Sequence, residues 1–373
     1  MAARAGILVP VLAALLAGWA YRPVLRPPPP RICGSPGGPP VTSPRVKLSD
    51  GRYLAYRERG VPREAARHRI VIIHGFRDSK DISLNVSQEL MQARGVYIVS
   101  YDRAGYGESD PNPRRSARSD AEDIQQLADQ LGLGRRFLVI GISMGGYSAW
   151  SCIKHIPHRL AGVALVVPAI NYWWPSLPAE LSKAAYRRLD RSDQRTFWIA
   201  RHAPWLLYGY LNQKLVTPSK LIAGHPDVYC PQDKEILRAQ AANPPPAENT
   251  VVTQQGEYES LHRDLMVLTG DWGFEPESLP DPFAGGEGSV HIWHGSEDRL
   301  VPVDVQRYVA GRIPWVRYHE SAGGGHLFFN LRHCSEAILE ALLPHPGGGD
   351  GGPEQPAPGP PSGPLDRERE QAG

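Results

Sequence analysis

Residues 137–146 read FLVIGISMGG, and this stretch decides the fold. A short apolar run, typical of a strand buried on both faces, leads into a G-x-S-x-G motif, and helical sequence follows. Such a sharp turn strains the serine backbone, so the flanking Gly141 and Gly145 must be almost free of side chain. The turn would lift the hydroxyl of Ser143 above the sheet and aim the backbone N–H of Met144 at a developing oxyanion. In this setting the motif predicts a nucleophilic serine rather than a tight turn alone.

Short apolar runs of the same kind recur on both sides of this stretch, and helical patterns separate them. The runs lie at 70–73, 96–100, 163–167 and 290–293, and the helical patterns at 83–94, 119–131 and 146–155. This alternation predicts an α/β fold, in which a mostly parallel sheet is flanked by helices. Residues 46–48 and 53–56 flank Asp50-Gly51 and predict a hairpin. Chemistry in parallel sheets lies outside the carboxyl ends of the strands, so we expect the site there.

The alternation stops between residues 171 and 288. This stretch is rich in aromatic and basic residues, and its pattern indicates helices at 178–189, 194–211, 232–241 and 257–269. Because it interrupts the order of the strands, we interpret residues 171–288 as a mainly helical lid inserted over the core. The core then consists of residues 46–170 and 289–344. Aromatic residues such as Trp173 and Trp174 are expected to hold the lid to the core rather than line a pocket.

The two ends of the chain differ from this body in composition. Residues 5–21 carry no charge and lie between Arg4 and Arg22, although the run is at the short edge of the roughly 17–25 residues that a membrane span needs. A single membrane anchor or a signal peptide is therefore predicted, with membrane association or passage through the secretory pathway; a helix packed on the body is the alternative. The rest of the region 1–45 is a Pro/Gly-rich linker. Residues 345–373 are expected to be disordered.

Composition excludes several classes of function. The chain has 373 residues and a formal net charge of +2, so no basic surplus indicates a nucleic-acid partner. Its four cysteines are far apart and show no metal-binding spacing, and the sequence contains no GxxxxGK[ST] phosphate loop. We therefore expect neither a metal ion nor another cofactor.

Four further motifs accompany the serine motif. They read IHGF at 73–76, YDRAGYGES at 101–109, HGSEDRLVP at 294–302 and GGGH at 323–326. With these motifs in this order the chain resembles the α/β-hydrolase fold superfamily, in its lid-bearing branch of serine hydrolases and esterases, and looks like plant members of that branch. The resemblance covers roughly residues 46–343. Many members carry histidine before the serine, where this chain has Ile142.

The catalytic groups of this superfamily occur in the order serine, acid, histidine. After Ser143, Asp298 and His326 satisfy that order, and both follow strand-like runs by short loops. A carboxylate is needed to hold the imidazole tautomer, and the ordinary histidine pKa of about 6.5 suits proton transfer near neutrality. The weaker rivals are Asp271 for the acid, and His319 and His333 for the base.

The resemblance also implies roles for residues around the serine. The backbone N–H of Phe76 is expected to be the second oxyanion donor, beside that of Met144. Other positions near the site are expected to be structural, with the histidine among them bracing the oxyanion loop: His74, Gly75, Gly141, Gly145 and Asp102, the last in an ion pair with Arg103.

These residues predict a serine hydrolase that cleaves a carboxylic ester or related acyl bond of a small molecule through an acyl-enzyme intermediate. Epoxide and haloalkane hydrolysis on this fold use an aspartate at the position of Ser143, so both are disfavoured. The first alternative is a receptor that keeps the fold and holds a small molecule without turnover, because a fold alone does not imply catalysis. The second is an acyltransferase that passes the acyl group to an alcohol.

Overall fold

The computed structural model of the chain describes residue 18 and residues 26–242 and 252–343. These residues belong to one unit, Met1–Leu343. A second unit, Pro344–Gly373, lies outside the described residues, and so does the predicted disordered tail.

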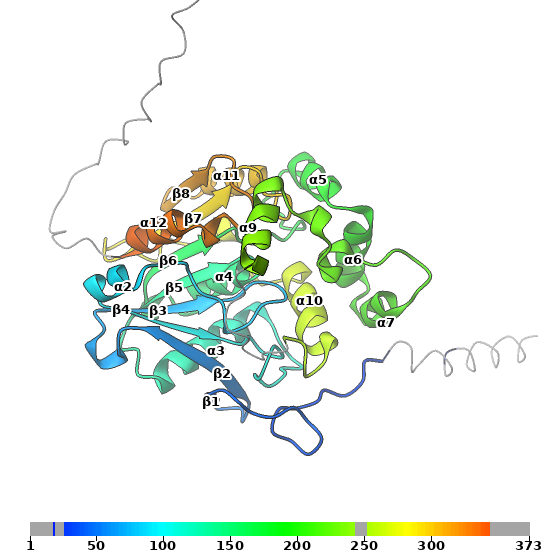
Figure 1. Cartoon of the computed structure of the whole chain (residues 1–373). Helices are drawn as coiled ribbons and strands as arrows, with labels where there is room; N and C mark the ends of the chain where they lie inside the picture. The colour runs from blue at the N-terminus through cyan, green and yellow to red at the C-terminus, as the bar shows by residue number, and fades with distance from the viewer. Residues whose placement is uncertain (1–17, 19–25, 243–251, 344–373) are drawn as a thin grey trace, which may run out of the picture. The chain divides into compact units, whose positions relative to one another are not determined.

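The described residues form an eight-stranded sheet in the order β1-β2-β4-β3-β5-β6-β7-β8 (Figure 1). The first two strands pair antiparallel with their neighbours, and all other pairs are parallel. Every residue of β4 and β5 is buried, as expected for strands covered on both faces. The predicted α/β fold with a mostly parallel sheet is thus confirmed. The strands are β1 Arg45–Lys47, β2 Tyr53–Gly60, β3 His68–Ile73, β4 Val96–Tyr101, β5 Phe137–Ile142, β6 Leu160–Val166, β7 Val290–Gly295 and β8 Val316–Ser321.

Helices cover both faces of the sheet. Alternate residues of β3 belong to different apolar clusters, because successive strand side chains point to opposite faces. Val71 and Ile73 pack in the cluster that contains residues of α3, α4 and α11. Ile70 and Ile72 pack in the cluster that contains residues of α2 and α12. The bounds are α2 Gln88–Arg94, α3 Ala117–Gln130, α4 Gly145–His155, α11 Val303–Arg312 and α12 Arg332–Leu342.

The starts of two neighbouring helices differ in a way that matters for the site. Helix α3 begins at a capping box, in which the Ser116 hydroxyl accepts a hydrogen bond from the N–H of Ser119. Helix α4 begins directly after the serine turn, and no side chain caps its first turn. Its N-terminal N–H groups and the positive end of its dipole therefore face the site.

A helical region lies between β6 and β7, and it corresponds to the stretch that we predicted to be a lid. Figure 1 shows its helices gathered beside the sheet rather than within its two helical layers. A π-helical turn, Tyr258–His262, leads into the last of them. The helices are α5 Ala179–Arg188, α6 Arg191–His202, α7 Leu207–Asn212, α8 Lys220–Ala223, α9 Pro231–Ala242 and α10 Arg263–Thr269.

One prediction about the N-terminus must be corrected. Within residue 18 and the ranges 26–242 and 252–343, no helix is both long and apolar enough to cross a bilayer. This finding contradicts the predicted transmembrane helix and the membrane-associated location, and we withdraw both. Apart from Gly18, the segment 5–21 on which they rested lies outside the described residues. Its length was already at the lower limit for a span.

Part of the predicted linker also differs from expectation, because it packs on the core. The Glu108 carboxylate accepts hydrogen bonds from the N–H and hydroxyl groups of both Thr42 and Ser43, at 2.6–3.0 Å. Cys33 is buried, and its N–H donates to the side chain of Gln255 at 3.1 Å. These polar contacts order a stretch whose Pro/Gly content alone indicated a solvated spacer.

Candidate active site

The strand-to-helix turn after β5 has the backbone that the serine motif predicted. Ser143 has φ of 51°, in the left-handed region that is unfavourable for a residue with a side chain. A Cβ on Gly141 would lie 2.6 Å from the Ala149 Cβ, and a Cβ on Gly145 would overlap the carbonyl oxygen of Ile73. Both glycines are therefore required by close packing of β5, α4 and β3.

Three side chains that are distant in sequence meet at the carboxyl edge of the sheet. Ser143 Oγ lies 3.0 Å from His326 Nε2, and His326 Nδ1 lies 2.7 Å from Asp298 Oδ2. Ser143 follows β5, Asp298 follows β7 and His326 follows β8, so parallel strands bring all three to one edge. This is the spacing of a nucleophile, a base and an orienting acid.

The rival residues lie elsewhere in the structure. Asp271 accepts a hydrogen bond from the N–H of Gly273 in an exposed turn. His319 stacks on Trp293 within the sheet, and His333 lies in α12. None of the rivals contacts Ser143 within the part of the chain that the structure describes.

The Asp298 carboxylate is fixed by backbone as well as by histidine. Its Oδ1 accepts hydrogen bonds from the N–H groups of Leu300 and Val301 at 2.8 and 2.9 Å. Burial favours the neutral acid, but His326, His294 and the Val301 amide outweigh it, so the pKa of Asp298 is lowered. The acid is therefore ionised, as a group that stabilises an imidazolium must be.

The electrostatic setting of His326 suits a base. Burial lowers the pKa of its imidazole, but the charge and hydrogen bond of Asp298, with a smaller effect of Asp233, raise it above the ordinary value. A raised pKa strengthens the imidazole as a proton acceptor. It also means that more of the base becomes active as the pH rises through that pKa.

A small apolar chamber of about 40 Å³ lies directly at Ser143. Phe76 and Met144 line it together with the nucleophile. Among the described residues neither of their backbone N–H groups donates to a protein acceptor, so both are available to a developing oxyanion. The other side chains that line this chamber include Tyr172, Phe197, Leu221, Leu268 and Leu300.

His74 holds the loop that carries Phe76. Its Nε2 accepts a hydrogen bond from the N–H of Arg103 at 3.0 Å, and its Nδ1 lies 2.7 Å from the carbonyl oxygen of Gly75. The ring is fully buried, and burial, with the nearby charge of Arg103, lowers its pKa well below the ordinary value. A Cβ on Gly75 would come within 3.1 Å of the Ser143 Cβ, which explains the glycine.

The profile of the alpha/beta hydrolase fold family matches residues 68–331. The chain belongs to this family. Membership places it among hydrolases and supports the overall resemblance noted from its motifs.

Two solved structures of this fold are similar to the hydrolase. One is a thermophilic esterase from Thermogutta terrifontis, 18% identical, with a TM-score of 0.52 and coverage of 80% of this chain and 98% of that one. The other is the esterase EaEST from Exiguobacterium antarcticum, 16% identical, with a TM-score of 0.54 and the same coverages. At these identities the likeness shows the fold alone.

A curated relative matches over a shorter stretch. The 2-hydroxy-6-oxononadienedioate/2-hydroxy-6-oxononatrienedioate hydrolase 2 of Pseudomonas putida is 35% identical over 101 residues, which is 26% of this chain and 35% of that protein. The alignment thus spans about a third of the length of this relative.

One predicted contact in the hydrolase is wrong. Asp102 and Arg103 do not pair with each other, because adjacent residues at a strand end point to opposite sides. Asp102 instead lies 3.2 Å from Lys80 Nζ and accepts hydrogen bonds from the N–H groups of Lys80 and Glu108. Arg103 forms a bidentate pair with Asp264, at 2.6 Å for each bond.

Asp264, on α10, is a buried carboxylate that we did not single out from the sequence. Besides Arg103 it lies 3.3 Å from Arg115, and it accepts hydrogen bonds from the hydroxyls of Tyr106 and Tyr147 at 2.6 and 2.7 Å. Burial opposes its ionisation, but the two arginines outweigh burial and lower its pKa to about 2. One signal could have found it: Asp264 lies three and four positions before Val267 and Leu268, on the same face of α10, and an acid on an apolar face must find a buried partner.

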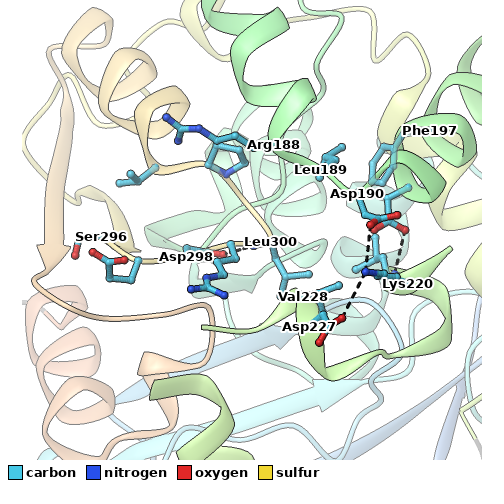
Figure 2. A pocket seen from close by; sticks show the side chains of 16 residues that line it. Arg188, Leu189, Asp190, Phe197, Lys220, Asp227, Val228, Ser296, Asp298 and Leu300 are labelled. Atoms are coloured by element: carbon cyan, nitrogen blue, oxygen red, sulfur yellow. Dashed lines mark hydrogen bonds and ion pairs between the residues drawn. The ribbon is translucent and has the colours of Figure 1, made fainter. Parts of the chain in front are cut away.

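A second, larger cavity of about 450 Å³ is lined by the loop of Asp298 and by residues of the inserted region (Figure 2). Phe197, Leu221 and Leu300 line both this cavity and the chamber at Ser143, so the two spaces are neighbours. The larger cavity is more polar: Lys220 on its wall pairs with Asp190 at 3.2 Å and Asp227 at 3.4 Å (Figure 2). Of these two spaces, the smaller chamber is the one that Ser143 lines.

Neither the larger cavity nor the chamber holds a metal-ligand set. Among the residues that the structure describes, no group of three or more His, Cys, Asp or Glu side chains is placed to bind an ion.

Proposed function

We propose that this hydrolase cleaves a carboxylic ester or related acyl bond through an acyl-enzyme on Ser143. The observation that carries the proposal is the continuous chain of contacts from Ser143 Oγ through the His326 imidazole to the Asp298 carboxylate, at 3.0 and 2.7 Å. A serine hydroxyl is a weak nucleophile until a base takes its proton, and this chain supplies both the base and the group that orients it.

The steps follow from this arrangement. His326 Nε2 takes the proton as Ser143 Oγ bonds to the acyl carbon, and the N–H groups of Phe76 and Met144 bind the oxyanion. The C–O bond to the leaving alcohol then breaks, and the imidazolium returns the proton to that oxygen. Water, deprotonated by His326, attacks the acyl-enzyme, and collapse releases the acid and restores Ser143. Asp298 stays ionised throughout and stabilises the imidazolium.

The two cavities suggest the shape of the substrate. The carbonyl carbon must lie beside Ser143, in an apolar chamber of only about 40 Å³, which suits a short acyl group. The neighbouring cavity of about 450 Å³, lined by charged groups such as Lys220 and Asp227, suits a larger polar alcohol. We therefore propose short-chain acyl esters of polar alcohols as the substrate class.

We further propose that the helical region 171–288 acts as a lid. Tyr172, Phe197 and Leu221, which come from this region, line the chamber over Ser143. Side chains from an inserted region that close an apolar space at the nucleophile would exclude water from the reaction.

The direct test is labelling with a fluorophosphonate together with hydrolysis of p-nitrophenyl esters from acetate to octanoate. We expect Ser143→Ala to abolish labelling and to lower kcat by roughly 10⁶-fold. Ser148→Ala is the matched control. Ser148 lies on α4 and its hydroxyl donates a hydrogen bond to Asp120, so this variant should keep both labelling and turnover. Unchanged labelling or turnover in Ser143→Ala would remove the assignment.

The same assay panel separates the alternatives. Tight binding of a ligand without turnover would favour a receptor, and acyl products on an added alcohol would favour transfer. The Pseudomonas putida relative is named for a dienedioate that contains no ester, so carbon–carbon bond hydrolysis is the second candidate. Faster turnover of a 2-hydroxy-6-oxo-dienedioate than of any ester would favour it.

A further inference from the structure

The loop that carries His326 is held by two adjacent side chains of α9, in the inserted helical region. The N–H of Gly325 donates to Gln232 Oε1 at 2.9 Å. The N–H groups of His326 and Leu327 donate to Asp233 Oδ2 and Oδ1 at 3.0 and 2.7 Å. Three consecutive backbone N–H groups, centred on the base, thus end on one dipeptide that lies 93 or 94 residues away in sequence.

The His326 loop and the start of α9 are closely packed at this junction. Asp233 is fully buried. A Cβ on Gly325 would overlap both the Asp233 carboxylate and the Cys230 sulfur, so only glycine allows the loop to approach α9 so closely. The third glycine of the GGGH motif is therefore explained by α9, and the backbone of His326 cannot shift without breaking buried hydrogen bonds.

The charge at this junction also acts on the imidazole. The groups that face His326 are Ser143 after β5, His294 and Asp298 from β7 and its following loop, and Asp233 from α9. The Asp233 carboxylate accepts hydrogen bonds from the N–H groups of Cys230, His326 and Leu327. Its hydrogen bonds come from backbone N–H groups, so its negative charge remains available to stabilise the imidazolium.

We propose that Asp233 is a positioning residue for the reaction, which fixes the His326 backbone from the inserted region and supports the protonated state of its ring. The proposal rests on the proposed serine-hydrolase function. It makes the inserted region part of the catalytic apparatus and not only a cover over it. Asp233 lines neither cavity, so its influence should fall on the chemical step rather than on substrate binding.

A purely structural role is the alternative, because Asp233 also caps its own helix. Its carboxylate accepts a hydrogen bond from the N–H of Cys230 at 3.3 Å, and its N–H donates to Cys230 Sγ at 3.5 Å. A capping role alone predicts lower stability with unchanged chemistry in the remaining folded enzyme.

The experiment compares pH profiles of kcat/KM for the wild-type chain, Asp233→Asn, Asp233→Ala and Cys230→Ala. Asn keeps one accepting oxygen and removes the charge, so the acidic limb of the profile should move to lower pH by up to about one unit. Asp233→Ala should lower kcat by on the order of 10²-fold with little change in KM, because the imidazole loses its fixed position. Cys230→Ala weakens the cap alone and should keep the wild-type profile.

The results for the two Asp233 variants decide whether Asp233 is a positioning residue. A pH profile of Asp233→Asn that matches the wild type, or an effect of Asp233→Ala confined to KM, would overturn the proposal. If Asp233→Ala does not fold, Asp233→Asn, checked by thermal unfolding, still decides. Activity that survives in Ser143→Ala would instead refute the proposed function, so the two failures are distinguishable.

Discussion

Two buried carboxylates from the inserted region hold two different loops of the core, and they do so by different means. Asp264, on α10, pairs with Arg103 and with Arg115, which also pairs with Asp120. Arg103 in turn donates to the carbonyl oxygen of Gly75, in the loop that carries Phe76, at 3.0 Å. Asp233, on α9, accepts hydrogen bonds from the backbone N–H groups of His326 and Leu327, and from that of Cys230 at the start of its own helix. The carboxylate of Asp264 balances buried positive charge, whereas the carboxylate of Asp233 accepts backbone hydrogen bonds and so fixes the position of the His326 loop.

This difference predicts different consequences of losing each one. A buried ion pair that loses one partner leaves uncompensated charge in a low-dielectric interior, which chiefly affects stability. A backbone N–H that loses its acceptor costs less, but here the backbone carries the base, which chiefly affects rate. The predictions below compare these two regions, with the core carboxylate Asp298 as the reference.

The largest effect is expected at Asp298, which touches the imidazole itself. Asp298→Asn should lower kcat by about 10⁴-fold, because the amide favours the wrong histidine tautomer. Steady-state kinetics on a short-chain ester measures it. If Asp233→Ala lowered kcat as much as Asp298→Asn does, orienting the imidazole ring and fixing the His326 backbone could not be told apart.

The next effect is on stability at Asp264. Asp264→Ala should destabilise the fold by about 3–5 kcal/mol, because buried Arg103 loses its carboxylate partner and Arg115 keeps only Asp120. Urea unfolding followed by tryptophan fluorescence measures this free energy. Asp233→Asn, measured in parallel, should lose about 1–3 kcal/mol. Equal losses of unfolding free energy would show that the two carboxylates stabilise the fold to the same extent, against the comparison made above.

A smaller effect should appear as pH dependence of stability. The pKa of Asp264 is lowered to about 2 in the folded state from an ordinary value of 3.8. A depressed pKa contributes stability above the unfolded value, and this contribution is lost as the pH falls through the folded value. The contribution is roughly 2 kcal/mol between about pH 4 and pH 2. Unfolding curves of Asp264→Asn should lack this part of the acid dependence, and an unchanged curve would contradict it.

The smallest effects are expected at the edges of the two regions. Gln232→Leu removes one neutral acceptor from Gly325 and should lower stability by about 1 kcal/mol, with the histidine pKa in the kcat/KM profile unchanged. A shift of that pKa in Gln232→Leu would show that the effect does not come from the charge of Asp233.

Leu221, which lines both cavities, offers a further small change. Leu221→Ala should raise the ratio of kcat/KM for octanoate over acetate about tenfold, because the apolar chamber opens toward the larger cavity. The ratio is measured with matched p-nitrophenyl esters. An unchanged ratio would show that Leu221 does not limit the length of the acyl group.

The core was largely predictable from the sequence, and the inserted region was not. Five apolar runs and the glycines around Ser143 predicted the parallel sheet and its turn, because strand burial and left-handed backbone impose local residue types. Most helices of the inserted region were also predicted from their periodicity, but α8 was not, and the run at 194–211 is divided between α6 and α7. The contacts of Asp233 and Asp264 were not, since a single acid in a helix belongs to no motif.

Two predictions were wrong, for different reasons. The Asp102–Arg103 pair was assumed from adjacency in sequence, whereas neighbours on extended backbone diverge. The membrane span was inferred from composition near the lower limit of length, and no described helix supports it.

By itself the sequence determined the strands of the sheet and the tight turn at Ser143, because each depends on residues that lie within a few positions of one another. Only the tertiary structure decided that His326 and Asp298 reach Ser143, that Arg103 pairs with Asp264 and that Asp233 holds the histidine loop. These contacts join residues 28 to 183 positions apart. Hydrogen bonds and charge pairs act over a few ångströms in space, and a linear pattern does not encode which distant side chains the packing brings together.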